Sequence, residues 1–187
     1  MEAKILKDIP FALDTAALLK RLRIPKHGEH AAAAIALGDA AHPIARPKAM
    51  YKEAYIEEKG EDCVIIDGIT FTSRVLRVNL EPAHRVFPYL ATCGREIMEW
   101  ADAIDDPLDS FYADEIMIMA LRSATAAVQK AILDDYSPGK TSSMNPGSLE
   151  DWPLEQQIHL MELLGDPCQA IGVELTPSCL MLPVKSV

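Results

Sequence analysis

The last quarter of the chain sets how the rest is interpreted: residues 142–165 read SSMNPGSLEDWPLEQQIHLMELLG, and residues 171–187 read IGVELTPSCLMLPVKSV. A polar turn at residues 145–148 leads into an apolar periodic stretch that starts after Asp151 and stops at Gly165. Asp caps free N–H groups at a helix start, Pro153 is tolerated in a first turn, and Gly ends helices. The pattern therefore predicts a final helix capped by Asp151, followed by a strand over residues 173–182.

Helical spacing recurs through the rest of the chain. Capping residues, apolar periodicity and proline stops predict five further helices, over residues 14–21, 29–41, 73–80, 95–104 and 106–134. The longest of them carries a face of small and apolar residues, namely Ile116, Met119, Ala120, Ser123, Ala127 and Ala131. Such a face permits close packing, either in the core or along a groove.

Extended patterns lie between these helices. Residues 48–58 alternate as one strand, and residues 85–91 are apolar and extended. Asp67-Gly68 between the apolar runs 63–66 and 69–71 is a strong hairpin signal. Because helices do not separate the strands regularly, we expect an α+β protein with an antiparallel or mixed sheet packed by helices. We expect a single domain over residues 1–187, with a helical N-terminal part at 1–45 and the main body at 46–187.

Charge and composition limit the classes of function. The net charge of −10 argues against unaided binding to nucleic acid or to an anionic membrane, since both need concentrated Lys and Arg. The longest apolar stretches are interrupted by charged residues, so we expect no stretch that approaches a transmembrane span. The first residues, MEAKILKDIPFALD, lack a signal-peptide pattern, which predicts a cytoplasmic protein. The four cysteines contain no C-x-x-C pair, and buried free thiols are the expectation.

Motifs for independent catalysis are weak. His27 and His30 flank Glu29 without completing a ligand set, so we expect no metal site. Residues 137–142, SPGKTS, lack the spaced first glycine of a phosphate-binding loop. Asp105 and Asp106 precede a predicted helix, where capping explains them without catalysis. We therefore expect no catalytic residue.

The terminal segment resembles the activation domain of cobalamin-dependent methionine synthase and its stand-alone relatives. That family has a P-G-x-x-D-x-P-L-x-x-Q helix, then I-G-V-x-L-T and a P-x-K-S-V ending. This chain has Pro146-Gly147, then Asp151 and Pro153-Leu154 one residue later than in that pattern, and it matches the other two motifs at 171–176 and 183–187. The likeness runs from about residue 64 onward. Because the chain stops within the P-x-K-S-V-S-G motif, a truncated C-terminus stays open.

The resemblance implies a site for S-adenosylmethionine at the polar turn. The residues it singles out for cofactor binding are Asn145, Pro146, Gly147, Ser148 and Lys185. Gly147 lets a ligand approach the backbone, and its neighbours offer polar groups. However, the family's R-x-x-P-G-Y loop has its arginine at Ser143 and its tyrosine at Ser148, and a family acidic residue falls at Ala127. We therefore expect no tightly bound cofactor, with S-adenosylmethionine held weakly and cobalamin reached only through a partner.

Two classes of function remain open. The first is an accessory module, without catalysis of its own, that docks on a corrinoid protein or methyltransferase and assists reductive reactivation. The second is a small-molecule enzyme or sensor that uses the same groove for an S-adenosylmethionine-like or amino-acid ligand. An exposed apolar groove would favour the module, whereas convergent titratable groups would favour the enzyme. A homo-oligomer is left open.

Overall fold

The computed structural model describes residues 2–187. Its helices are α1 (Thr15–Leu22), α2 (Glu29–Ala41), α3 (Arg74–Asn79), α4 (Arg95–Asp102), α5 (Pro107–Tyr136), α6 (Gln157–Leu164) and α7 (Pro167–Ile171), with a short 3-10 helix η1 (Leu154–Gln156) before α6. Its strands are β1 (Lys4–Leu6), β2 (Lys48–Tyr51), β3 (Ala54–Lys59), β4 (Cys63–Ile66), β5 (Ile69–Thr72), β6 (Arg85–Val86), β7 (Tyr89–Thr92), β8 (Glu174–Leu175) and β9 (Met181–Leu182).

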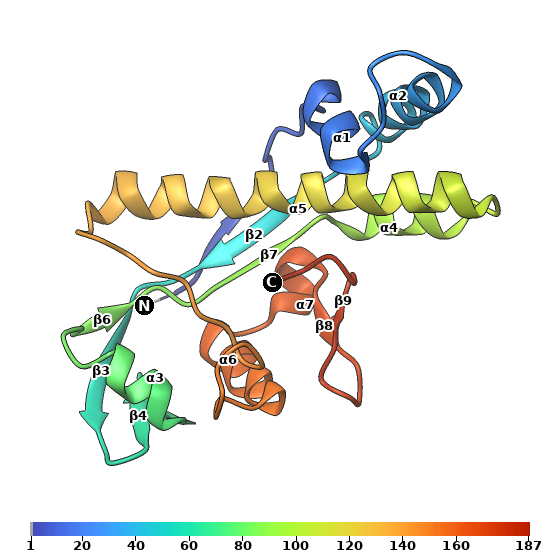
Figure 1. The fold of residues 1–187 in the computed structure, drawn as a ribbon. Coiled ribbons are helices and arrows are strands. Elements are labelled where there is room, and N and C mark those ends of the chain that lie inside the picture. The colour runs from blue at the N-terminus through green and yellow to red at the C-terminus, as the bar shows by residue number, and fades with distance from the viewer. Residues whose placement is uncertain (1) are drawn as a thin grey trace.

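The long helix α5 crosses the whole molecule (Figure 1). Helices α1 and α2 lie on one side of it, and the antiparallel sheet β1-β2-β7 lies on the other. A second antiparallel sheet, ordered β5-β4-β3-β6, forms the far end of the molecule with α3 and α6 beside it. Small antiparallel sheets packed by helices confirm the α+β prediction.

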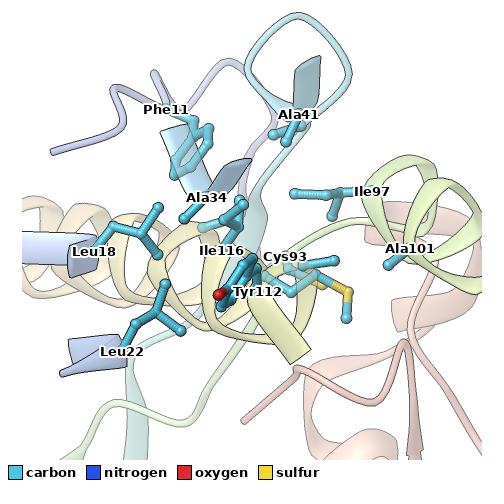
Figure 2. Packing of buried hydrophobic residues seen from close by; sticks show 14 of the residues in the cluster. Phe11, Leu18, Leu22, Ala34, Ala41, Cys93, Ile97, Ala101, Tyr112 and Ile116 are labelled. Atoms are coloured by element: carbon cyan, nitrogen blue, oxygen red, sulfur yellow. The ribbon is translucent and has the colours of Figure 1, made fainter. Parts of the chain in front are cut away.

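The largest apolar cluster joins α1, α2 and α4 to the N-terminal half of α5. Leu18, Ile97, Tyr112 and Ile116 are fully buried there, and Ala34 lets α2 come close to α5 (Figure 2). Each buried Leu or Ile contributes about 1.5–3 kcal/mol relative to an exposed one. This cluster holds the N-terminal helices on the outer side of α5, away from the sheet.

The buried face of α5 differs from the predicted one. Its buried residues are Tyr112, Ala113, Ile116, Met117, Ala120, Ala124, Val128 and Ile132. Of the predicted face only Ile116 and Ala120 are buried, while Met119, Ser123, Ala127 and Ala131 are half-buried. The prediction holds only in part, although Met119 and Ala131 also pack against core clusters. Helix α5 contacts both a helical layer and a sheet, and these cover a stripe rotated from the one that small residues suggested.

By length and composition alone, α5 is also apolar enough to cross a membrane, and it is the only such helix among residues 2–187. This corrects the expectation that no stretch approaches such a span. The finding is weak support for a membrane role, because the core helix of a globular protein passes the same test.

Two predicted strands are each broken into two. Residues 48–58 form β2 and β3, and residues 85–91 form β6 and β7. Strand β2 pairs with β7, whereas β3 pairs with β4 and β6, so each broken strand contributes to both sheets. The breaks lie side by side, because the Lys52 N–H donates to the Pro88 carbonyl at 3.1 Å. Pro88 has no N–H to continue a ladder, which explains the break on its strand.

Three predicted helix caps and one predicted hairpin turn are confirmed. Ser73 caps α3, Asp14 caps α1 and Asp106 caps α5, each accepting from a backbone N–H. Asp67 and Gly68 connect β4 and β5 with φ of 46° and 81°, the left-handed values that a tight hairpin turn requires. These features depend on neighbouring residues only, which is why the sequence predicts them.

Asp151 does not cap the helix that follows it. Its carboxylate accepts from the Ser73 hydroxyl at 2.5 Å and from the Arg74 N–H at 2.8 Å, so it caps the start of α3 across the fold. The prediction of a helix capped by Asp151 is therefore wrong, although Gly165 does end α6 as expected. The real start is η1, which follows Pro153 without a side-chain cap.

The predicted strand over residues 173–182 is a small hairpin instead. Glu174 pairs with Leu182 and Leu175 with Met181, with a turn between them. The helix α7, which the sequence did not predict, precedes this hairpin and begins at an Asp166 cap. The last residues then lie along β7, where Ala91 and Val187 exchange hydrogen bonds of 2.8 and 2.9 Å.

We predict that removing the cap of α3 destabilises the protein. Ser73→Ala should cost about 1 kcal/mol, because the Ser73 hydroxyl accepts from the Leu76 N–H and donates to Asp151. For a chain of this length that lowers the melting temperature by about 2–4 °C. Thermal unfolding followed by circular dichroism measures the shift, and an unchanged midpoint contradicts the prediction.

The same cap predicts a pH dependence. The bond from Ser73, with those from backbone N–H groups, holds the pKa of Asp151 below its usual range. A lowered folded pKa means that this contribution is present above the unfolded value near 3.8 and is lost as pH falls through the folded pKa. Asp151→Asn should have a lower melting temperature than wild type at pH 7, and the difference between the two melting temperatures should become smaller below about pH 4. Asp105→Asn, at an exposed site, is the control and should show no such narrowing.

Candidate functional site

An open groove of about 1070 Å³ runs between the α5–β7 layer and the far end of the molecule. Its walls come mainly from the C-terminal part of α5, the β6–β7 crossing, α3, α6, the connection 138–146 and the chain end at Val184, Ser186 and Val187. The lining also includes Ile66, Phe71, Trp152, Leu180 and Met181. These segments are far apart in sequence and meet only because both broken strands cross between the two sheets. The fold therefore builds the groove at the junction of its two sheets.

The groove wall is mostly apolar. Leu80, Phe87, Val128, Ile132 and Leu160 are among its lining residues. Within residues 2–187 its lining contains no Asp, Glu, His or Cys. General acid–base pairs and activated thiols are most often built from these residue types, and of the other titratable residues that can serve in catalysis the lining holds Tyr89 and Lys140. The groove is therefore a largely apolar binding surface with few titratable side chains.

Two cations belong to the lining, Arg85 and Lys140. Arg85 is held in place: its guanidinium lies 2.6 Å from the buried Glu53 carboxylate and stacks over the rings of Phe87 and Tyr136 at 5.4 and 5.8 Å. Lys140 is exposed on the connection from α5. The groove thus carries positive charge on an otherwise acidic protein, which favours a neutral or anionic occupant over a cationic one.

The polar turn lies at one edge of this groove. Asn145 and Pro146 line it, whereas Gly147 and Ser148 do not. The Ser148 hydroxyl donates to the Asn145 carbonyl at 2.6 Å, and the Gly147 N–H donates to the Trp152 carbonyl at 2.7 Å. The Ser148 hydroxyl is therefore used in hydrogen bonds within the turn. Asn145 is the polar residue of the turn that lines the groove.

Gly147 is required by the turn itself. Its φ is 83°, and a Cβ there would lie 3.1 Å from Leu154 Cδ1, facing η1. The space left by the missing side chain of Gly147 therefore faces Leu154 and not the groove. This gives Gly147 a conformational role in addition to any part in ligand approach.

Lys185 lies apart from the turn. Its ammonium pairs with Asp114 of α5 at 2.8 Å, and its carbonyl accepts from the Cys93 N–H at 3.0 Å. The groove takes Ser186 and Val187 from this segment but not Lys185. The structure thus brings together Asn145, Pro146 and the chain terminus, and leaves the Lys185 side chain on α5.

Ser143 stands where the resemblance expects an arginine. It lines the groove, and its hydroxyl lies 3.0 Å from the hydroxyl of Tyr89 on β7. This contact fastens the connection 138–146 to the sheet. It does not replace a guanidinium that could pair with a ligand carboxylate.

Gln157 is a groove residue that the sequence reasoning missed. It begins α6, is 8% exposed and lines the groove, and its side-chain oxygen has no hydrogen-bond partner. A buried polar group left unpaired costs about 1–3 kcal/mol. The only sequence signal was its place as the last residue of P-L-x-x-Q, which was used to identify the segment and not to assign a role.

The remaining candidates lie outside the groove. Among residues 2–187 no three His, Cys, Asp or Glu side chains are grouped so that they could hold a metal ion. His27 and His30 therefore belong to no such group. Cys93 and Cys179 are buried as expected, but Cys63 is half-buried and Cys168 is exposed. Burial raises the pKa of the Cys93 thiol to about 12, so this thiol is inert at neutral pH.

We predict that Gly147→Ala destabilises the protein by about 1–2 kcal/mol, because an L side chain disfavours the left-handed conformation. Gly139→Ala is the matched control, since a Cβ at Gly139 meets no atom within 4 Å. Urea unfolding of both variants measures the difference. Equal midpoints would contradict the conformational role of Gly147.

Comparison with known proteins identifies the fold. No protein-family model matches the sequence, and no curated protein matches it. The crystal structure of the MetH reactivation domain bound to AdoHcy is similar over 100% of this chain and 77% of that chain, with a TM-score of 0.63 and 13% sequence identity. This protein therefore has the fold of the MetH reactivation domain, as the resemblance in its terminal segment predicted.

Proposed function

We propose that this protein is an accessory module that docks on a corrinoid protein of a methyltransferase system and assists the reductive reactivation of its cobalt centre. Its fold is that of a domain named for reactivation. The observation that carries the proposal is the groove, which is wide, mostly apolar and, among the described residues, lined by no Asp, Glu, His or Cys side chain. In this proposal the electrons come from a partner, and the module supplies a docking surface.

The apolar rim of the groove supports a macromolecular partner. Leu133, Leu180 and Val184 line the groove although each is more than half exposed. Exposed apolar side chains gathered around a concavity are typical of interaction sites. Burying one such side chain contributes up to about 1.5–3 kcal/mol. A corrinoid domain seated here would cover this rim.

The alternative is a small-molecule enzyme or sensor. One observation favours it: the similar solved structure holds AdoHcy, and a groove of about 1070 Å³ is large enough for a ligand of that size. Without an acid–base pair in the groove, this alternative fits a sensor better than an enzyme.

Docking can be tested with cobalamin-dependent methionine synthase from which the activation domain has been removed. We expect the purified chain to bind this protein in its cob(II)alamin state, measured by biolayer interferometry. Absence of binding by the wild-type chain contradicts the proposal.

A pair of matched variants locates the docking surface. Val184→Asp places a charge on the groove rim at a site 58% exposed, and Val78→Asp makes the same change on α3, at a site 56% exposed and outside the groove lining. We expect Val184→Asp to weaken docking at least about tenfold, equivalent to about 1.4 kcal/mol. Val78→Asp should leave the docking affinity unchanged. If both variants weaken docking equally, the interface is not at the groove rim.

We further predict that S-adenosylmethionine binds weakly. Losing a charge-assisted arginine contact costs about 1.5–3 kcal/mol, roughly ten- to a hundredfold in affinity. Calorimetric titration should show no heat with wild type up to about 1 mM ligand, while Ser143→Arg should gain measurable binding. Micromolar binding by wild type would show that backbone contacts suffice and would revive the small-molecule alternative.

A further inference from the structure

We propose that Gln157 is the polar anchor of the groove and recognises a neutral ligand group in which a hydrogen-bond donor stands beside an acceptor. The inference rests on the proposed function in using the same groove. Two sources offer this chemistry, the edge of an aminopurine nucleoside and the primary carboxamides on the rim of a corrin ring. Neither the comparisons nor the predicted site residues assign Gln157 a role.

The unpaired state of Gln157 is unusual in this molecule. Within residues 2–187, only two buried side-chain atoms lack a partner, the oxygen of Gln157 and Oε2 of Glu96. Glu96 is accounted for, because its other oxygen lies 2.7 Å from the Lys48 ammonium. Gln157 alone combines an unpaired buried oxygen with a place in the groove lining.

The adjacent glutamine shows that the fold does not need Gln157 for its own bonds. The Gln156 amide accepts from the Thr72 N–H at 3.0 Å and from the Trp152 indole N–H at 3.1 Å, and donates to the Thr72 carbonyl at 3.0 Å. It satisfies the backbone N–H and carbonyl of Thr72 at the end of β5. Gln157 is buried beside it with its side-chain oxygen unpaired, so this amide keeps hydrogen-bonding capacity at the groove wall.

The walls near Gln157 suit a flat ligand. Phe71, Trp152 and Leu163 form one buried cluster and also line the groove. Leu160 lies three residues after Gln157, on the same face of α6, and lines the groove as well. Apolar walls lower the local dielectric, which strengthens a hydrogen bond made there.

The charge of the groove disfavours a cationic group at this position. A cationic group would meet no Asp or Glu side chain in the described lining, and it would meet Arg85 and Lys140 instead. A glutamine amide carries both a donor N–H and an acceptor oxygen. It pairs with a complementary edge through two bonds, as glutamine does with adenine. Rotating the amide by 180° exchanges the two atoms, so either can face the ligand.

The test uses Gln157→Leu with Gln169→Leu as the control, since Gln169 is an exposed residue on α7 outside the groove lining. Adenosine and dicyanocobinamide are titrated separately by calorimetry, and thermal melting is recorded for each variant. Dicyanocobinamide carries corrin carboxamides but no nucleotide, so the two arms separate the two sources.

We expect wild type to bind one of the two probes, and Gln157→Leu to lose at least about tenfold in affinity for it while melting at the same or a higher temperature. Gln169→Leu should change the affinity less than about twofold. A stable Gln157→Leu with unchanged affinity overturns the inference. Binding of neither probe to wild type overturns it too, and leaves Gln157 as a residue that holds only water.

The failure of this inference is distinguishable from failure of the proposed function. If Gln157→Leu docks on the corrinoid protein as wild type does and neither probe binds, the anchor is wrong and the docking proposal stands. If wild type binds a probe through Gln157 but does not dock, the anchor stands and the protein is a small-molecule binder.

Discussion

Close contact between α5 and the central sheet is the constraint on which the rest of this structure depends. Ala124 of α5 packs in one cluster with Ala49 of β2 and Ala91 of β7, and all three are fully buried. Ala49 and Ala91 are also directly paired across the two strands. With only methyl groups at these positions the helix can approach the sheet closely, and a larger side chain at any of them would separate the layers.

The groove follows from the length of that helix. At 30 residues α5 extends about 45 Å, beyond the short strands β2 and β7 that it covers. Its last turns therefore lie next to the place where the strands cross to the second sheet. Val128 and Ile132 in these turns pack in a core cluster and also line the groove. The chain must then return from the end of α5 to α6, and the connection 138–146 closes the groove on its way.

The turn at the edge of the groove is fixed from both sides. Gly147 bonds to Trp152, and Asp151, between them, bonds across to the start of α3. Ser143 reaches β7 through Tyr89 at the other end of the same connection. The resemblance marked this segment as a binding loop, and the structure shows a loop whose own polar groups are largely occupied. A buried polar atom of the groove that stays unpaired lies further along the chain, at Gln157.

Local features of the fold could be predicted from the sequence, because they depend on residues a few positions apart. The caps at Asp14, Ser73 and Asp106 and the Asp67-Gly68 turn are of this kind. The features that sequence reasoning missed depend on distant partners. Asp151 was assigned to the helix beside it because the competing N–H groups of Arg74 and Val75 lie more than 70 residues away, and the strand break at Lys52 is visible only once Pro88 lies opposite it.

The groove could not be predicted as a whole for a related reason. Asn145 and Pro146 were singled out through a local turn motif and lie in the lining, whereas a groove assembled from many separate segments has no signature in any one of them. Gln157 carries no charge and no motif chemistry, so only its burial without a partner distinguishes it from Gln156. A partner or ligand that fills this groove must contact segments from both sheets at once. Binding there would stabilise the junction of the sheets by mass action, because the unfolded chain has no such surface. Because an occupant of the groove contacts both sheets, its binding is suited to depend on how the two sheets are placed relative to each other.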